Sequence, residues 1–195
     1  MDHLRPATSA SVTIRLARTS ELRAIAAIER EAAQRFLETH QAWIAQDPPA
    51  PEGLLAERLE AGGLWVAILP DDRPVAAIRL RPLEAVLYIE QLDVLPEFSG
   101  RRLGAGLLDK AGSLAGAAGL EALVLSTFRD IPWNAPWYSR IGFEVIEVLP
   151  AALVDIRREN LARGLDKSRR VFMRREVNHP LAGRADRTGQ RPPDW

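Results

Sequence analysis

The segment Leu87–Leu108 (LYIEQLDVLPEFSGRRLGAGLL) constrains what this chain can fold into more than any other segment. An apolar run that ends at Val94 predicts a strand, and a small-residue helix is expected directly after the Gly/Arg turn 96–104. Amide groups at a helix N-terminus lack partners and carry about half a positive charge. Glycine lets such a backbone approach a phosphate closely, and Arg101 and Arg102 add positive charge. The segment therefore predicts a strand–turn–helix unit with an anion site suited to a pyrophosphate.

The commoner phosphate-binding loops are not compatible with this sequence. No G-x-x-x-x-G-K-[ST] motif occurs, which excludes a P-loop NTPase. No G-x-G-x-x-G follows the first predicted strand, which disfavours a Rossmann domain. The Gly/Arg turn also follows the fourth predicted strand, so three strands precede the anion site.

Strands and helices interleave along the rest of the chain. Their order, β-α-α-β-β-β-α-β-α-β-α-β, predicts one mixed sheet with helices on both faces, an α/β architecture. We expect one domain over 11–177, a flexible N-terminus over 1–10 and a flexible tail over 178–195. The predicted strands are Ser11–Ala17, Leu64–Leu69, Pro74–Leu80, Leu87–Val94, Leu120–Thr127, Phe143–Val148 and Arg170–Val177. The predicted helices run from an N-cap at Thr19 or Ser20 to Phe36, over Gly53–Ala61, from the turn to Ala118, from Asn134 to Gly142 and over Ala152–Arg163.

Composition narrows the function classes. The 195 residues include 26 Lys and Arg against 26 Asp and Glu, so no bulk attraction to nucleic acid or anionic lipid is expected. The absence of cysteine excludes disulfides, a thiolate nucleophile and iron–sulfur clusters. His3, His40 and His179 are widely spaced, so no metal site is expected. No apolar run reaches the ~18–20 residues that span a bilayer, and no signal-peptide pattern occurs, which predicts a cytoplasmic protein without a membrane partner.

Two motifs together make the chain resemble the GNAT N-acetyltransferase superfamily. The first is Val94-x-Pro96 with the turn Ser99–Gly104 at the head of a helix. The second is Tyr138–Phe143 (YSRIGF), which is similar to the family's Y-x-x-x-G-F and places glycine at the left-handed end of a short helix. The resemblance implies a single domain with a mixed, mostly antiparallel central sheet. That sheet is splayed between its fourth and fifth strands and flanked by helices on both faces.

The resemblance also implies acetyl-CoA as the cofactor. Backbone groups of Leu92, Asp93 and Val94 on the fourth strand would hydrogen-bond pantetheine and polarise the thioester carbonyl. Two positions of the turn depart from the family pattern, because Ser99 replaces the usual Arg or Gln and Arg102 replaces the first glycine. The implied pyrophosphate contacts are Ser99, Gly100, Arg101, Arg102, Leu103, Gly104 and Ala105.

Glu90 and Tyr138 are the catalytic residues that the resemblance implies. Glu90 matches the general base of the polyamine-type acetyltransferases, whereas the histone-type position falls two residues earlier. The alternative is a structural Glu90 paired with an arginine such as Arg79 or Arg81. Tyr138 matches the tyrosine that acts as general acid to the CoA sulfur, and its alternative role is only to pack against pantetheine. Asp93 is the second candidate carboxylate, although strand alternation points it toward the face opposite Glu90.

The sequence is compatible with more than one role for Asn134 and with more than one kind of acceptor. Relatives carry an asparagine seven residues before the tyrosine, but Asn134 lies only four before it and is also suited to be the helix N-cap. The segments that would form the acceptor pocket contain aromatic and imidazole side chains that suit either a substrate or the core, namely Phe36, His40, Trp43, Trp65, Trp133 and Trp137.

The predicted function is acetyl-CoA-dependent transfer of an acetyl group to a primary amine of a small molecule, by direct attack in a ternary complex. Two alternatives remain: a protein acetyltransferase acting on lysine or an N-terminus, and an acyl-CoA sensor without turnover. A homodimer is possible because relatives are often dimers.

Overall fold

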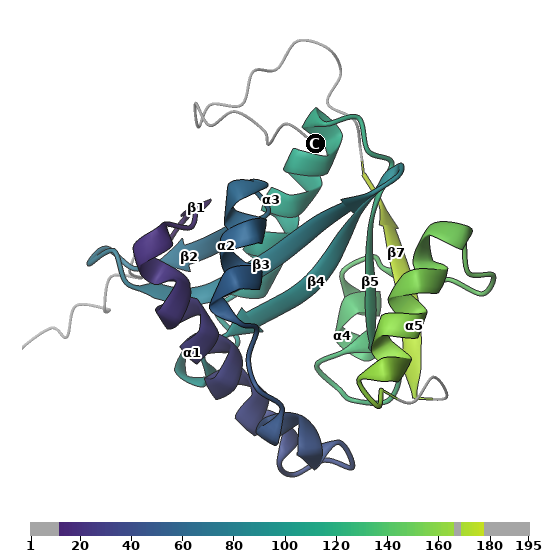
Figure 1. Ribbon diagram of the computed structural model, residues 1–195, viewed down its shortest axis with the longest axis horizontal. Coiled ribbons are helices and arrows are strands. Elements are labelled where there is room, and N and C mark those ends of the chain that lie inside the picture. The colour runs from purple at the N-terminus through teal and green to yellow at the C-terminus, as the bar shows by residue number, and fades with distance from the viewer. Residues whose placement is uncertain (1–11, 166–168, 178–195) are drawn as a thin grey trace, which may run out of the picture.

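The fold is given by a computed structural model that describes residues 12–165 and 169–177 (Figure 1). The expected flexible termini, including Trp195, lie outside the described residues. The strands are β1 (Thr13–Leu16), β2 (Leu64–Ile68), β3 (Pro74–Leu83), β4 (Val86–Val94), β5 (Ala122–Phe128), β6 (Glu144–Val145) and β7 (Arg170–Glu176). The α-helices are α1 (Leu22–Ala33), α2 (Glu52–Glu60), α3 (Leu103–Ala117), α4 (Ala135–Arg140) and α5 (Val154–Ala162). Single 3₁₀ turns precede or follow several of them, at Thr19–Glu21, Gln34–Phe36, Ala42–Gln46, Pro96–Phe98 and Ala151–Leu153.

The seven strands form one sheet in the order β1-β2-β3-β4-β5-β7-β6. Every neighbouring pair is antiparallel except β4 and β5, which are parallel. The β4–β5 pairing begins at Val86 with Ala122 and stops at Ile89 with Leu125, although β4 continues to Val94. Beyond this point the two strands part (Figure 1). The predicted mixed, mostly antiparallel sheet with a splay between the fourth and fifth strands is confirmed.

Helices cover both faces of the sheet, as the α/β prediction requires. Apolar residues of α3, among them Leu107, Leu108 and Leu114, pack into the main core together with Tyr138 of α4. On the opposite face, α1 and α2 cover one half of the sheet and α5 covers the other half (Figure 1). The helices pack on the sheet because the helical spacing of their apolar side chains gives each of them one face to bury.

A bulge in β4 sets the orientation of the side chains at the splay. Arg79 of β3 pairs with Gln91, whereas the next residue of β3 pairs with Ile89, so Glu90 is the extra residue on β4. Ile89 and Leu92 consequently both pack toward the α3 core. Glu90 and Asp93 both face α1 and α2, and the expectation that Asp93 faces away from Glu90 is wrong.

Two local predictions also differ from the structure. The helix expected from Thr19 or Ser20 starts with a 3₁₀ turn and becomes α-helical only at Leu22, because the Glu21 carboxylate accepts the backbone N–H of Arg18 at 2.8 Å. The strand expected over 143–148 is only two residues long, because β6 pairs with β7 alone at the edge of the sheet. Val148 has left the sheet and is 86% exposed.

No helix in the described part of the chain is long and apolar enough to cross a membrane. Within residues 12–165 and 169–177, no three His, Asp or Glu side chains are grouped so that they could hold a metal ion.

Candidate active site

The turn before α3 has the backbone geometry of an anion site. Gly100 and Arg102 both adopt left-handed conformations, with φ of 76° and 63°. The amide of Gly106 makes the first bond of the helix, to the carbonyl of Arg102 at 3.0 Å. The amides of Leu103, Gly104 and Ala105 therefore have no acceptor within the helix. The predicted strand–turn–helix unit is confirmed, and the phosphate contacts of Ser99–Ala105 stay a prediction that this geometry supports.

The conformation of Arg102 shows what its departure from the family pattern costs. A left-handed backbone costs a residue with a Cβ about 1–2 kcal/mol and costs glycine little, so the family's glycine is the unstrained residue at this position. Arg102 is exposed, and its side chain is free to reach a bound anion. The substitution therefore exchanges backbone strain for a positive charge at the turn.

We expect Arg102→Gly to stabilise the fold by about 1 kcal/mol, because it removes the left-handed strain. Chemical denaturation of the variant measures this change in the free energy of unfolding. Arg101→Gly is the matched control, since Arg101 has no positive φ and stacks its guanidinium on Phe98 at 4.9 Å. A loss of stability of equal size in both variants would contradict the claim that the left-handed backbone of Arg102 is strained.

Asn134 provides a buried donor at the start of α4. It occupies the N-cap position of α4, but its side chain makes no capping hydrogen bond. Its Nδ2 is buried without a hydrogen-bond partner among the described residues, as is Nε1 of Trp133. Buried donors of this kind are rare unless a ligand or a water pairs with them. Asn134 therefore occupies the N-cap position without capping the helix, and its side chain is available to a cofactor.

The ring of Tyr138, a residue of α4, lies between two other aromatic rings. Its ring meets Trp137 at 4.8 Å and Phe143 at 5.4 Å, both edge-on. Burial, and secondarily the charge of Asp93, raises the pKa of the Tyr138 phenol well above its usual value. The phenol is therefore a neutral proton donor at physiological pH. Gly142 has φ of 90°, which confirms the left-handed helix end predicted for the second motif.

Glu90 is held by three guanidinium groups. Arg58 of α2 donates from Nε and Nη2 to the two carboxylate oxygens at 2.8 and 3.0 Å. Arg79 and Arg81 of β3 make ion pairs with the same carboxylate at 3.2 and 3.1 Å. The side chain of Glu90 is 11% exposed. These contacts match the alternative interpretation of Glu90, a structural carboxylate paired with Arg79 and Arg81, and they leave little room for a substrate amine.

Asp93 has the environment of a general base. Its Oδ1 accepts a hydrogen bond from Gln91 at 3.0 Å. Burial, followed by the Glu29 carboxylate of α1, raises the pKa of Asp93 to about 7, against the opposing effects of the Gln91 hydrogen bond and of Arg79 and Arg35. A base with a pKa near 7 is half deprotonated at neutral pH. Asp93 also lies near enough to Tyr138 to affect the pKa of the phenol.

A sequence feature that points to Asp93 exists. The apolar residues of β4 switch phase between Ile89 and Leu92, and this break in alternation is the mark of a bulge. With the bulge placed at Glu90 and Gln91, Asp93 comes to the same face as Glu90. Unbroken alternation along the strand would place Asp93 on the opposite face.

The aromatic and imidazole residues that were candidates for the acceptor pocket lie in four different places. Phe36 and Trp133 form a cluster with Phe128, in which the Phe36 ring meets the other two at 5.7 and 5.9 Å. Trp65 is a core residue, only 2% exposed, with its indole N–H bonded to the Gly62 carbonyl at 2.9 Å. Trp137 packs on the start of α3, where a Cβ added to Gly104 would lie 3.4 Å from its ring. His40 and Trp43 are exposed, and His40 pairs with Asp130 at 3.4 Å.

The fold and this site define an acyltransferase of the N-acetyltransferase class. The chain belongs to the GNAT acetyltransferase family, because the model of the "Acetyltransferase (GNAT) family" matches residues 20–143, more than half of the chain. The resemblance found in the two sequence motifs is confirmed.

Solved structures of other family members share the fold. The PaiA N-acetyltransferase of Thermoplasma acidophilum in complex with coenzyme A is 17% identical, with a TM-score of 0.63 over 85% of this chain and 99% of that one. N-acetylglutamate synthase of Neisseria gonorrhoeae, complexed with coenzyme A and N-acetyl-glutamate, is 19% identical, with a TM-score of 0.61 over 88% of this chain and 36% of that one. The ribosomal-protein-S18-alanine N-acetyltransferase of Escherichia coli is 15% identical, with a TM-score of 0.57 over 90% and 100% of the two chains.

Proposed function

We propose that this protein transfers an acetyl group from acetyl-CoA to the primary amine of a small molecule. The observation that carries the proposal is the junction of three features where β4 and β5 part. These are the amide-lined turn before α3, the neutral Tyr138 phenol, and Asp93 with a pKa of about 7. The cytoplasmic location expected from the sequence, and a homodimer, stay predictions.

The residues present fit coenzyme A. The unpaired amides of 103–105 and the exposed Arg101 and Arg102 suit the pyrophosphate. The buried Nδ2 of Asn134 lacks an acceptor among the described residues. The backbone of 90–94 has no strand partner on its β5 side, which suits a ligand that hydrogen-bonds like a strand. Acetyl-CoA supplies an acetyl group already activated as a thioester.

The chain's own residues manage two protons. Asp93 accepts a proton at its carboxylate oxygen from the attacking amine, which arrives largely as an ammonium ion near neutral pH. The Tyr138 hydroxyl gives its proton to the departing thiolate, and its oxygen regains a proton from the nitrogen as the amide forms. We place Asp93 rather than Glu90 in the role of base, because Glu90 is already bonded to three arginines. Glu90 instead fixes β3, β4 and α2 around Asp93.

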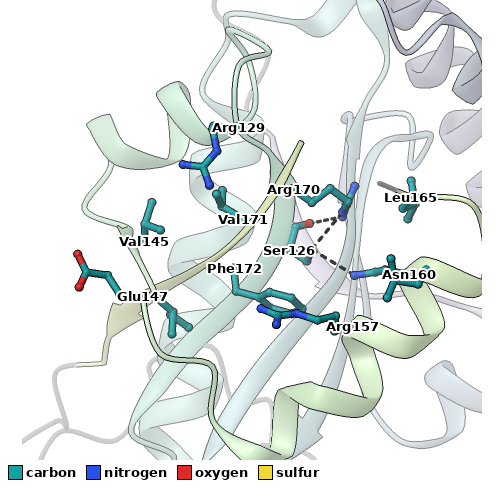
Figure 2. Close-up of a pocket in the computed structure, with 12 residues that line it drawn as sticks. Ser126, Arg129, Val145, Glu147, Arg157, Asn160, Leu165, Arg170, Val171 and Phe172 are labelled. Carbon is teal, nitrogen blue, oxygen red and sulfur yellow. Dashed lines mark hydrogen bonds between the residues drawn. The ribbon is translucent and has the colours of Figure 1, made fainter. Parts of the chain in front are cut away.

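In support of a small-molecule acceptor, the α5 side of the sheet has a cavity, whose lining does not include Asp93 or Tyr138. The cavity has a volume of about 390 Å³ and is lined by residues of β5, β7 and α5 (Figure 2). Cavities of about 300–1,000 Å³ are typical of small-molecule sites, whereas a protein substrate needs a longer groove.

Release of free thiol from acetyl-CoA against a panel of amines, peptides and proteins tests the proposal. We expect thiol release that depends on a small amine, with the acetylated amine identified by mass spectrometry. Turnover on lysine peptides or protein N-termini alone would replace this acceptor class by a protein acetyltransferase. Binding of acetyl-CoA without turnover on any acceptor would favour the sensor and contradict the catalytic roles of Asp93 and Tyr138.

A further inference from the structure

Among the charged side chains that line the cavity beside α5, cations outnumber carboxylates. Arg129, Arg157 and Arg170 contribute to its wall, against a single carboxylate, that of Glu147. In Figure 2, Glu147 lies on the opposite side of the view from Arg170. Arg129 and Arg157 are exposed at the surface, whereas Arg170 is partly buried. The deepest charge in the cavity is therefore the guanidinium of Arg170.

Arg170 is fixed in place by neutral groups. Its Nε donates to the Ser126 hydroxyl at 3.1 Å and its Nη2 donates to the Ser126 carbonyl at 2.6 Å (Figure 2). Its guanidinium carbon lies 4.8 Å from the centre of the Phe128 ring. These contacts leave Nη1 without a hydrogen bond to any residue that the structure describes. The guanidinium is thus oriented before any ligand arrives.

No Asp or Glu among the described residues pairs with Arg170. This distinguishes it from Arg58, Arg79 and Arg81, which share the Glu90 carboxylate. Burial lowers the pKa of Arg170 to about 10, so it still carries its charge at neutral pH. A desolvated charge without a counter-ion is unfavourable, and an anionic ligand relieves that cost.

Ser126 adds a second donor at the same place. Its Oγ accepts one hydrogen bond from Arg170 and another from Nδ2 of Asn160 at 3.2 Å. A serine hydroxyl that accepts twice still has its own proton to donate. A guanidinium edge and a hydroxyl donor side by side match the oxygens of a carboxylate.

We propose that the acceptor is an amine that also bears a carboxylate, and that Arg170 and Ser126 bind this carboxylate. The inference rests on the proposed function for the identity of its ligand. A carboxylate is preferred to a phosphate because one buried cation is neutralised by a single negative charge, and the other two arginines are at the exposed rim. Arg170 also lies near enough to Tyr138 for its charge to lower the pKa of the phenol.

Matched acceptors and variants test the proposal. Amino acids are compared with their α-amides, and ω-amino acids with alkylamines of the same length, by thiol release from acetyl-CoA. We expect the carboxylate-bearing member to have a kcat/KM about 10–100-fold higher, the value of a charge-assisted hydrogen bond pair. Arg170→Gln should raise KM for that member by a similar factor and abolish the preference. Arg170→Lys keeps the charge and should recover part of the effect.

Arg158→Gln is the matched control. Arg158 lies on α5, is 74% exposed and pairs with Asp155 at 2.7 Å, away from the cavity. The control should retain the wild-type KM and the wild-type preference. Equal kcat/KM values for the two members of each pair, or a preference that survives Arg170→Gln, would overturn the proposal.

A second measurement separates this inference from the proposed function. Thermal unfolding is followed in sodium acetate and in sodium chloride at the same ionic strength, with no acetyl-CoA present. Acetate should raise the Tm of the wild-type protein and of Arg158→Gln more than that of Arg170→Gln. If thiol release fails with every amine, the proposed function is contradicted, and the acetate result still decides whether a carboxylate site exists. No difference between the wild type and Arg170→Gln in acetate overturns the site.

Discussion

Asp93→Asn is expected to lower kcat by about 10²–10⁴-fold, the contribution of a general base. The substitution keeps the size of the side chain and its bond to Gln91 but removes the proton acceptor. In the wild-type protein, kcat/KM should fall tenfold for each pH unit below about 7, because the base is then protonated. This acid limb of the profile should disappear in Asp93→Asn. Stopped-time thiol assays between pH 5 and 9 measure both effects.

Two controls keep this prediction separate from a loss of structure. Ionisation of Asp93 opposes folding, because its pKa is raised in the folded state. Its contribution to the free energy of unfolding is therefore greatest at low pH and is lost as the pH rises through about 7. Asp93→Asn should therefore have a Tm at pH 8 that is at least that of the wild type. Glu29→Gln removes the second cause of the raised pKa and should move the acid limb to lower pH. An active Asp93→Asn variant with an unchanged limb would contradict the role of Asp93.

Glu90→Gln is expected to destabilise the fold by about 3 kcal/mol, because three partly buried guanidinium groups lose the carboxylate that they share. Each guanidinium keeps one further carboxylate, from Glu57, Glu29 or Glu159. For a domain of this length the corresponding fall in Tm is about 10 °C. Chemical denaturation and calorimetry measure the loss. A variant that folds with wild-type stability and lacks only turnover would restore the interpretation of Glu90 as the base.

Glu57→Gln is the matched control for Glu90. Glu57 also pairs with Arg58, at 2.6 Å, but its side chain is 68% exposed. Exposed pairs contribute at most about 1 kcal/mol, so the control should be nearly as stable as the wild type. The contrast between the two variants isolates the effect of burial from the loss of one carboxylate charge.

Much of the fold is predictable from the sequence, because it depends on local patterns. Alternation and helical spacing gave the order of the twelve strands and α-helices, and the two GNAT motifs implied the splay between β4 and β5. The errors occur where tertiary contacts decide. Residues 146–148 suit a strand, but β6 ends at Val145, and only the Ile146 amide bonds further to β7, at the Phe172 carbonyl at 2.9 Å. The start of α1 is set by Glu21, whose carboxylate also bonds to Arg15 of β1.

The site was predictable in its cofactor half and less so in its acceptor half. The turn before α3 is continuous in sequence, so its residues could be named directly. The role of Asp93 depends on a one-residue bulge, and the partners of Glu90 come from α2 and β3, which are 9 to 32 residues away in the chain. Arg170 is a surface-type residue by sequence. Its burial against Ser126 and Phe128 follows from the pairing of β5 with β7, which no local pattern shows.

The proposed function requires acetyl-CoA to bind where β4 and β5 part. Isothermal titration calorimetry with acetyl-CoA tests this most directly, with free CoA and then pyrophosphate added as competitors. The geometry predicts a saturable isotherm with one site per chain, displaced by CoA and weakened by pyrophosphate. Absence of binding, or binding that neither competitor affects, would contradict both the turn before α3 as a phosphate site and the chemistry assigned to Asp93 and Tyr138.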